Sequence, residues 1–158
     1  DKSLVVAVSS IAARVPLPFQ GHYSAAKYAL EAYMGALRNE IREFGVRVSV
    51  VEPGDLSTGF TSKRKKAISD NSPYSSLYNR AIKEIEKDEK EGGEPIDAAK
   101  VIFSLTKRKN PPYRKAVGLT YKTLMFLLRF FLYWLTLFLL RKMYNLDGVN
   151  STDRAELI

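Results

Sequence analysis

The sequence predicts an α/β fold built on parallel strands, and three observations support this prediction. Leu4 to Val8 is a short apolar run rich in valine, as expected for a strand buried on both faces of a parallel sheet. A helical segment then extends from about His22 to Phe44 and stops at Gly45, a residue type that commonly ends helices. Val46 to Val51 is a second buried strand. Strand, helix and strand in this order form the right-handed crossover unit of α/β proteins.

The middle of the chain adds a long loop, two helices and a short strand. Residues 55–73 are polar and without periodicity, and loops of this length are usually lids or binding loops. The first helix is expected from Tyr74 to about Glu91, where a Gly-Gly pair stops it, and the second from Pro95 to about Lys107. After a break at two prolines, an edge strand is expected near Arg114 to Gly118.

A very apolar segment follows, from Thr123 to Leu140. Its eighteen residues contain one charge, Arg129, and approach the roughly 20 residues that a membrane span needs. Lys122, Arg129 and Thr136 recur every seven residues, so they share one stripe of a helix. We therefore predict one helix that lies on a membrane surface or in an apolar contact without crossing the bilayer. A helix buried over a substrate pocket, or in an oligomer contact, is the alternative.

Composition limits the class of protein. A chain of 158 residues can bury one ordinary core, and 46% hydrophobic with 27% charged residues is typical of a globular protein. Without cysteine there is no disulfide framework and no thiolate metal site, and no cluster of histidines and carboxylates suggests a metal. The absence of cysteine fits a reducing compartment, so we expect a cytoplasmic location.

The formal net charge of +8 is concentrated in four basic clusters. One interpretation is that these clusters are solvated loops and helix ends. The other is attraction to anionic lipid, because three of the clusters lie on or just before the apolar segment. No nucleic-acid-binding motif accompanies the charge, so we expect no nucleic-acid partner. The clusters are Lys63-Arg64-Lys65-Lys66, Lys107-Arg108-Lys109, Arg114-Lys115 and Arg141-Lys142.

The residues that carry chemistry are Tyr23 and Lys27, with Ser10 thirteen positions before the tyrosine. Four residues apart on a helix, the tyrosine and lysine project from one face. A free phenol titrates near pH ~10, and an ammonium nearby favours its ionised form, which suits proton transfer. A serine hydroxyl at the end of a strand can donate to a carbonyl oxygen and stabilise developing charge. Ser9 is disfavoured, because it would point to the other side of the strand.

Three motifs together resemble the short-chain dehydrogenase/reductase family. They are Val8-Ser9-Ser10, Tyr23-x-x-x-Lys27 and Pro53-Gly54-x-x-x-Thr58, in order and at family-like spacing. The resemblance implies that Ser10 orients a substrate carbonyl or hydroxyl and that Tyr23 is the general acid or base. It further implies that Lys27 makes the tyrosine more acidic and binds the nicotinamide ribose.

The same resemblance implies a nicotinamide-binding turn after the second strand. Pro53 and Gly54 match the family's turn, and glycine there would let the backbone approach a flat ring. The backbone of Leu56 would contact the carboxamide, and Thr58 would contact carboxamide or phosphate. Together with Tyr23 and Lys27, these residues form the expected site for NAD or NADP.

The resemblance implies a fold as well. Residues 1–118 correspond to the C-terminal half of a Rossmann-like doubly wound parallel sheet. Residues 119–144 would add an apolar, membrane-associated helix, and residues 145–158 a polar, disordered tail. No Gly-rich strand-turn-helix fingerprint for a dinucleotide occurs in the sequence, so the N-terminal nucleotide-binding half is expected to be absent.

The expected function is NAD(P)-dependent interconversion of an alcohol and a ketone or aldehyde. The stretch from Pro53 to Thr61 and the apolar tail look like family members near the retinol and hydroxysteroid dehydrogenases, which suggests a small hydrophobic substrate. We expect the complete protein to be a homo-oligomer, with peripheral contact to the cytoplasmic face of a membrane. The alternative is a truncated, non-catalytic fragment that only associates with membranes or partners.

Overall fold

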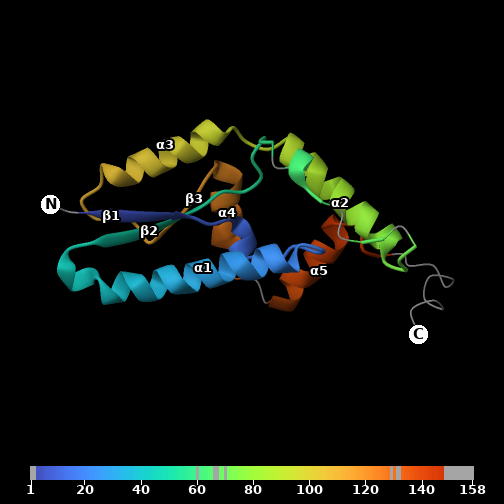
Figure 1. Cartoon of the computed structure of the whole chain (residues 1–158), viewed down its shortest axis with the longest axis horizontal. Coiled ribbons are helices and arrows are strands. Elements are labelled where there is room, and N and C mark those ends of the chain that lie inside the picture. Colours follow the sequence, from blue (N-terminus) through green and yellow to red (C-terminus); the bar gives the residue numbers. More distant parts are fainter. Residues whose placement is uncertain are drawn as a thin grey trace.

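A three-stranded parallel sheet with one helix on each side forms the centre of the computed structural model (Figure 1). The structure describes residues 3–59, 61–65, 68–69, 71–128, 130 and 133–147. The strands are β1 (Leu4–Val8), β2 (Arg47–Glu52) and β3 (Arg114–Ala116), in the order β1-β2-β3. In register, Val8 pairs with Val51 and Glu52 pairs with Ala116. The predicted α/β class, the buried second strand and the short edge strand are confirmed. The prediction that the first strand is buried on both faces is wrong: Val5 and Val8 of β1 are 39% and 48% exposed, because within the described residues only β2 pairs with this strand.

Helix α1 (Gly21–Glu40) covers one face of the sheet and α3 (Pro95–Thr106) covers the other (Figure 1). A 3₁₀ turn, η2 (Arg42–Phe44), ends the α1 segment at Gly45, whose φ of 73° confirms the predicted helix stop. Two hydrophobic clusters fill the layers between sheet and helices. Met34, Val48 and Val50 pack on the α1 side, and Val51, Ala98, Leu105 and Val117 pack on the α3 side.

Beyond the sheet, α2 (Ser75–Lys90) and the chain's last helices form a third hydrophobic cluster. Its buried residues are Val15, Ala81, Ile85, Leu140 and Tyr144. The polar stretch before α2 contains a short 3₁₀ turn, η3 (Thr61–Lys63), and is tied to α2 through Glu89. Glu89 accepts hydrogen bonds from Thr61 Oγ1 at 2.6 Å and Arg64 at 2.5 Å.

The single helix expected over 123–140 is wrong, because the structure has two helices there. They are α4 (Leu119–Leu127) and α5 (Tyr133–Met143). Met125 of α4 and Leu140 of α5 both pack in the cluster with α2, and Tyr121 of α4 also donates to the Asp55 carboxylate at 2.9 Å. Thr136, which shares the predicted stripe with Lys122, is buried, whereas Lys122 is exposed. Arg129 and residues 148–158 lie outside the described residues.

Candidate active site

The ends of β1 and β2 open at the same edge of the sheet and remain paired beyond the strands. The Ser9 amide donates to Val51 O at 2.8 Å, and the Ile11 amide donates to Pro53 O at 2.9 Å. Open α/β sheets bind ligands at the carboxyl ends of their strands. The segment with Ser10 therefore lies beside the Pro53-Gly54 turn, as the spacing of the motifs predicts.

Ser10 and Ser9 have different partners. Ser10 precedes the 3₁₀ turn η1 (Ile11–Ala13), and its Oγ accepts a hydrogen bond from the Ala12 amide at 3.1 Å. Ser9 Oγ donates to Glu31 Oε1 at 3.0 Å in a buried contact. The hydroxyl of Ser9 is thus bound to a helix carboxylate, while Ser10 Oγ accepts a hydrogen bond and its own proton stays available for donation.

Tyr23 and Lys27 lie one turn apart near the start of α1. Lys27 Nζ is 5.6 Å from the centroid of the Tyr23 ring and donates to Val8 O at 3.1 Å. The lysine therefore links the helix to the end of β1, two residues before Ser10. The structure thus places an ammonium and a phenol on one helix face, next to the strand end that leads to Ser10.

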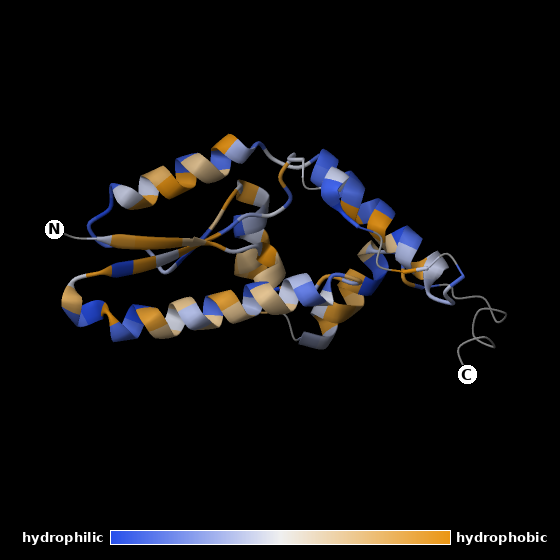
Figure 2. Ribbon diagram, viewed as in Figure 1, coloured by the Kyte–Doolittle hydropathy of each residue, from blue (hydrophilic) through white to orange (hydrophobic). Residues whose placement is uncertain are grey.

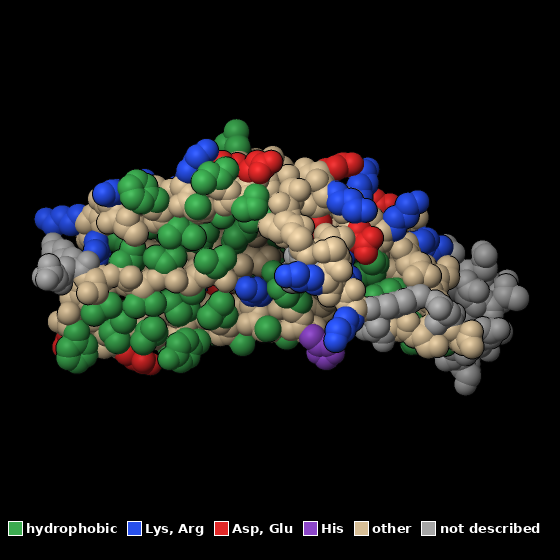
Figure 3. All heavy atoms as spheres, turned by 45° about the horizontal axis from the view of Figure 1, so that its top comes forward, with side chains coloured by type: hydrophobic (Ala, Val, Ile, Leu, Met, Phe, Trp, Pro, Cys, Tyr) green, Lys and Arg blue, Asp and Glu red, His purple; other side chains and the backbone are tan. Residues whose placement is uncertain are grey.

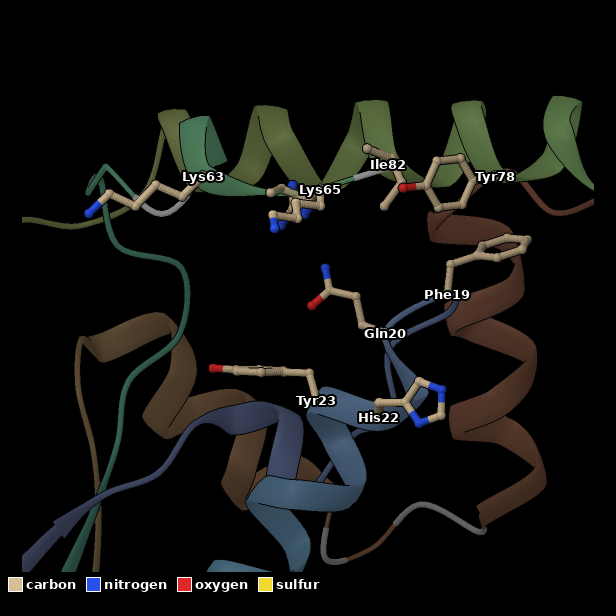
Figure 4. A pocket seen from close by; sticks show the side chains of 9 residues that line it. Phe19, Gln20, His22, Tyr23, Lys63, Lys65, Tyr78 and Ile82 are labelled. Carbon is tan, nitrogen blue, oxygen red and sulfur yellow. The ribbon is translucent and has the colours of Figure 1, made fainter. Parts of the chain in front are cut away.

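Tyr23 also lines an open pocket of about 260 Å³ (Figure 4). The pocket is bounded by the start of α1, the loop before it, α2 and the segment after η3. Figure 4 shows the side chains of Tyr23 and Gln20 extending into the space between these elements. Gln20 Nε2 is buried and has no hydrogen-bond partner within the described residues. Phe19, Tyr78 and Ile82 supply apolar walls, and Lys63 and Lys65 supply charge.

The predicted nicotinamide turn is partly occupied by an aromatic ring of the protein itself. A Cβ built on Gly54 would lie 2.1–2.3 Å from ring atoms of Tyr121, so only glycine lets this ring pack on the turn. Tyr121 donates to Asp55 Oδ2 at 2.9 Å and accepts from the Asp55 amide at 3.0 Å. Burial raises the pKa of Tyr121 to about 12, which keeps its donating proton in place.

The remaining predicted cofactor residues have different environments. Pro53 is buried, whereas Thr58 is exposed. Leu56 forms an isolated bridge with Gly93, and its side chain packs against the α3-side cluster. Ser10, Tyr23, Lys27 and the Pro53-Gly54 turn thus gather at one edge of the sheet, whereas Thr58 lies on the loop that leaves it.

Two buried carboxylates near the site were missed from the sequence. Glu31 and Glu52 are each only 3% exposed. A signal for Glu31 existed, because it lies eight residues after Tyr23 and four after Lys27, on the same helix face. Glu52 immediately precedes the Pro-Gly turn. Their contact with each other could not be read from spacing.

Sequence comparison connects this site to a known family. The family described as short chain dehydrogenase matches residues 1–69, which contain all three motifs. The 3-ketodihydrosphingosine reductase of Bacteroides thetaiotaomicron is 40% identical over 116 residues, 72% of this chain and 43% of that protein. The chain belongs to the short-chain dehydrogenase/reductase family. The 17-beta-hydroxysteroid dehydrogenase type 6 of Rattus norvegicus is 53% identical over a shorter stretch of 57 residues, 36% of this chain and 18% of that protein.

Solved structures of short-chain dehydrogenases share the fold. One from Streptomyces avermitilis has a TM-score of 0.59 at 29% identity, covering 74% of this chain and 42% of that one. One from Burkholderia phymatum, solved in complex with NAD, has a TM-score of 0.62 at 22% identity, covering 82% of this chain and 46% of that one. The chain thus spans less than half the length of these relatives.

Proposed function

We propose that the chain carries the catalytic centre of an NAD(P)-dependent oxidoreductase that interconverts an alcohol and a ketone or aldehyde. The observation that supports this most directly is the Tyr23–Lys27 pair, held against the end of β1 by the 3.1 Å bond from Lys27 to Val8 O. Ser10 follows two residues later, beside the Pro53-Gly54 turn. Membership of the short-chain dehydrogenase/reductase family supports the same reaction class.

Each residue has a distinct role in the proposed reaction. In the reduction, the Tyr23 hydroxyl gives its proton to the substrate oxygen, and in the oxidation the phenolate takes it back. The Lys27 ammonium stabilises negative charge on the phenol oxygen. Ser10 donates a hydrogen bond to the substrate oxygen, where charge develops. When bound, the nicotinamide supplies or accepts the hydride.

The residues present fit the nicotinamide end of such a cofactor. The Lys27 ammonium and the Tyr23 hydroxyl are donors that ribose hydroxyls accept, and both side chains are partly exposed. Pro53, Gly54, Leu56 and Thr58 would contact the nicotinamide side of the same cofactor, and the ring of Tyr121 would have to move off Gly54 to admit it. The sequence contains no Gly-rich turn for the pyrophosphate, so this chain would hold only one end of NAD or NADP.

We propose further that the substrate is hydrophobic and has a polar group near its reacting carbon. The walls of the pocket at Phe19, Tyr78 and Ile82 are apolar, which favours an alkyl or ring system. The unpartnered Gln20 Nε2 would donate to an oxygen of the substrate, because a buried amide without a partner is costly. Exposed apolar side chains on α4 and α5 would bring the protein to a membrane surface, where such substrates concentrate.

Tyr23→Phe in the natural full-length protein tests the proposed reaction. The variant keeps the ring but loses the transferable proton, so kcat should fall by at least ~10²-fold with little change in cofactor affinity. The assay follows oxidation of NADH and NADPH with a panel of long-chain ketones and cyclic ketones. Tyr33→Phe is the matched control, because Tyr33 is on the same helix and 66% exposed. A Tyr23→Phe enzyme within a few-fold of the parent would refute the assignment.

A further inference from the structure

Two carboxylates that the proposed reaction does not use meet directly behind the site. Glu31 extends from α1 and Glu52 from the end of β2, and each is 3% exposed. One guanidinium lies beside both carboxylates: Arg114 Nε is 2.8 Å from Glu31 Oε2 and 3.7 Å from Glu52 Oε1. Two neighbouring buried carboxylates resist simultaneous ionisation, so one of them holds a proton more tightly than an isolated glutamate would.

The surroundings decide which member carries the proton. Both oxygens of Glu31 accept hydrogen bonds, Oε1 from Ser9 Oγ at 3.0 Å and Oε2 from Arg114 Nε at 2.8 Å. Glu52 Oε1 has no hydrogen-bond partner within the described residues; the guanidinium groups of Arg14 and Arg114 lie 3.6 and 3.7 Å away. Glu31 is thus an acceptor with two donors in place, and Glu52 is the member that would carry the proton.

Charge effects agree with this geometry. Burial is the main cause that raises the pKa of Glu52 to about 7, and the charge of Glu31 adds to it. The guanidinium groups of Arg14, after η1, and Arg114, on β3, act in the opposite direction. Tyr113 of the segment before β3 donates to the Glu31 backbone carbonyl at 2.6 Å, so it holds the helix rather than the carboxylate.

Glu31 is connected to the catalytic residues at two points. On α1 it follows Lys27 by one turn, and both side chains bind the end of β1. Lys27 donates to Val8 O, and Glu31 accepts from the hydroxyl of the next residue, Ser9. Ser10 comes directly afterwards. Helix α1 therefore holds the strand end at successive residues, which sets the position of Ser10 relative to Lys27.

We propose that Glu31, buried near Glu52 and bound by Ser9 and Arg114, is a positioning residue that aligns Ser10 with Lys27 for catalysis. The proposal rests on the proposed oxidoreductase function. It predicts opposite results for the same chemical change in the two partners. Glutamine at position 52 can place its carbonyl oxygen near the two arginines and its amide protons toward Glu31, replacing the protonated acid. Glutamine at position 31 instead presents an NH₂ group to donors and loses the charge that Arg114 binds.

The experiment compares Glu31→Gln, Glu52→Gln and Ser9→Ala in the natural full-length protein. Because small misplacements of reacting groups are costly, kcat should fall about tenfold or more in Glu31→Gln and in Ser9→Ala. Their double variant should be no worse than the poorer single one, since both remove one hydrogen bond. Glu52→Gln should keep kcat within about twofold below neutral pH and should lose less activity than the parent above pH ~7. Glu40→Gln, at the exposed end of α1, is the matched control.

Three results would overturn the proposal. They are unchanged kcat in both Glu31→Gln and Ser9→Ala, multiplicative effects in the double variant, and equal loss in Glu31→Gln and Glu52→Gln. If Glu31→Gln does not fold, the single variants Ser9→Ala and Glu31→Asp are compared instead, and their melting temperatures show whether they fold. Activity of the Tyr23→Phe variant distinguishes failure of the positioning role from failure of the proposed function. If it is inactive while the Glu31 and Ser9 variants are normal, only the positioning role fails; if it is active, the proposed function fails.

Discussion

At the residue scale, one glycine and one glutamate at the end of β2 show how packing determines the surroundings of a side chain. Gly54 lies under the ring of Tyr121, and Glu52, two residues earlier, is buried against Glu31. One contact is steric and the other electrostatic. Gly54 belongs to the turn that would face the nicotinamide and Glu52 is buried behind it, so substitutions at the two positions test packing and charge separately.

Gly54→Ala should destabilise the protein by about 1–3 kcal/mol, the usual range for overpacking. The added methyl would meet ring atoms of Tyr121 at 2.1–2.3 Å and push the ring away from Asp55, its hydrogen-bond partner. Urea unfolding measures the change. Gly59→Ala is the control, because the nearest atom to its added Cβ is 4.0 Å away. Equal stability of the Gly54 and Gly59 variants would contradict this packing.

Glu52 should make stability depend on pH near neutrality. Burial raises its pKa in the folded protein from 4.5 to about 7, so the folded form binds this proton more tightly than the unfolded chain. The contribution is complete below the unfolded pKa and is lost as the pH rises through the folded value. Urea unfolding between pH ~5 and ~8 should show a decline in the parent that Glu52→Gln lacks. Parallel curves for the two proteins would contradict the shift.

At the scale of elements, α4 and α5 carry many exposed apolar side chains that do not pack against the sheet. Both helices contain many hydrophobic residues, interrupted by Lys122 in α4 and by Arg141 and Lys142 in the last turn of α5 (Figure 2). Phe126, Phe130, Tyr133, Trp134 and Phe138 are all exposed. Among the described residues, no helix is both long enough and apolar enough to cross a membrane. Lys122 of α4 and Arg141 and Lys142 of the last turn of α5 are also exposed.

We expect this surface to bind anionic vesicles more strongly than neutral ones, and more weakly as salt increases. Trp134 is the chain's single tryptophan and is 64% exposed, so its emission should shift to the blue when lipid covers it. Arg141→Glu together with Lys142→Glu should weaken binding, because both side chains would then repel the lipid. Emission that does not respond to either kind of vesicle would contradict a membrane contact at α5.

At the scale of the whole molecule, apolar side chains gather where β1, α1 and α3 lie together (Figure 3). β1 is the first strand of the sheet and has β2 on one side only within the described residues. Val5 and Val8 are 39% and 48% exposed, and Tyr33 and Phe103 of the flanking helices are more exposed still. An apolar strand edge of this kind is a template for pairing with another chain.

The 158-residue chain prepared alone should therefore associate as its concentration rises. Val5→Lys should reduce association, because a charge on an edge strand opposes further pairing. Ser76→Lys adds the same charge at an exposed position of α2 and is the control. Sedimentation velocity at several concentrations measures the outcome. A monomeric parent chain, or equal effects of both lysines, would contradict pairing at β1.

Local sequence determined the elements whose boundaries are marked by residue type. The valine runs became β1 and β2, and Gly45 ended the α1 segment at positive φ. Pro95 stands in the first turn of α3, as expected. Periodicity and stop residues act over a few positions, so the sequence alone was enough here. The spacing of Ser10, Tyr23 and Lys27 likewise indicated one candidate site.

Tertiary structure alone decided where the apolar tail bends and what supports the site. No glycine or proline interrupts residues 123–140, yet the segment forms two helices. Both pack in the cluster with α2, through Met125 and Leu140, and α4 also reaches Asp55 through Tyr121. Glu31 and Glu52 are 21 positions apart and meet only because α1 folds back over β2. Contacts between distant segments depend on how whole elements pack, and local propensity carries no information about that packing.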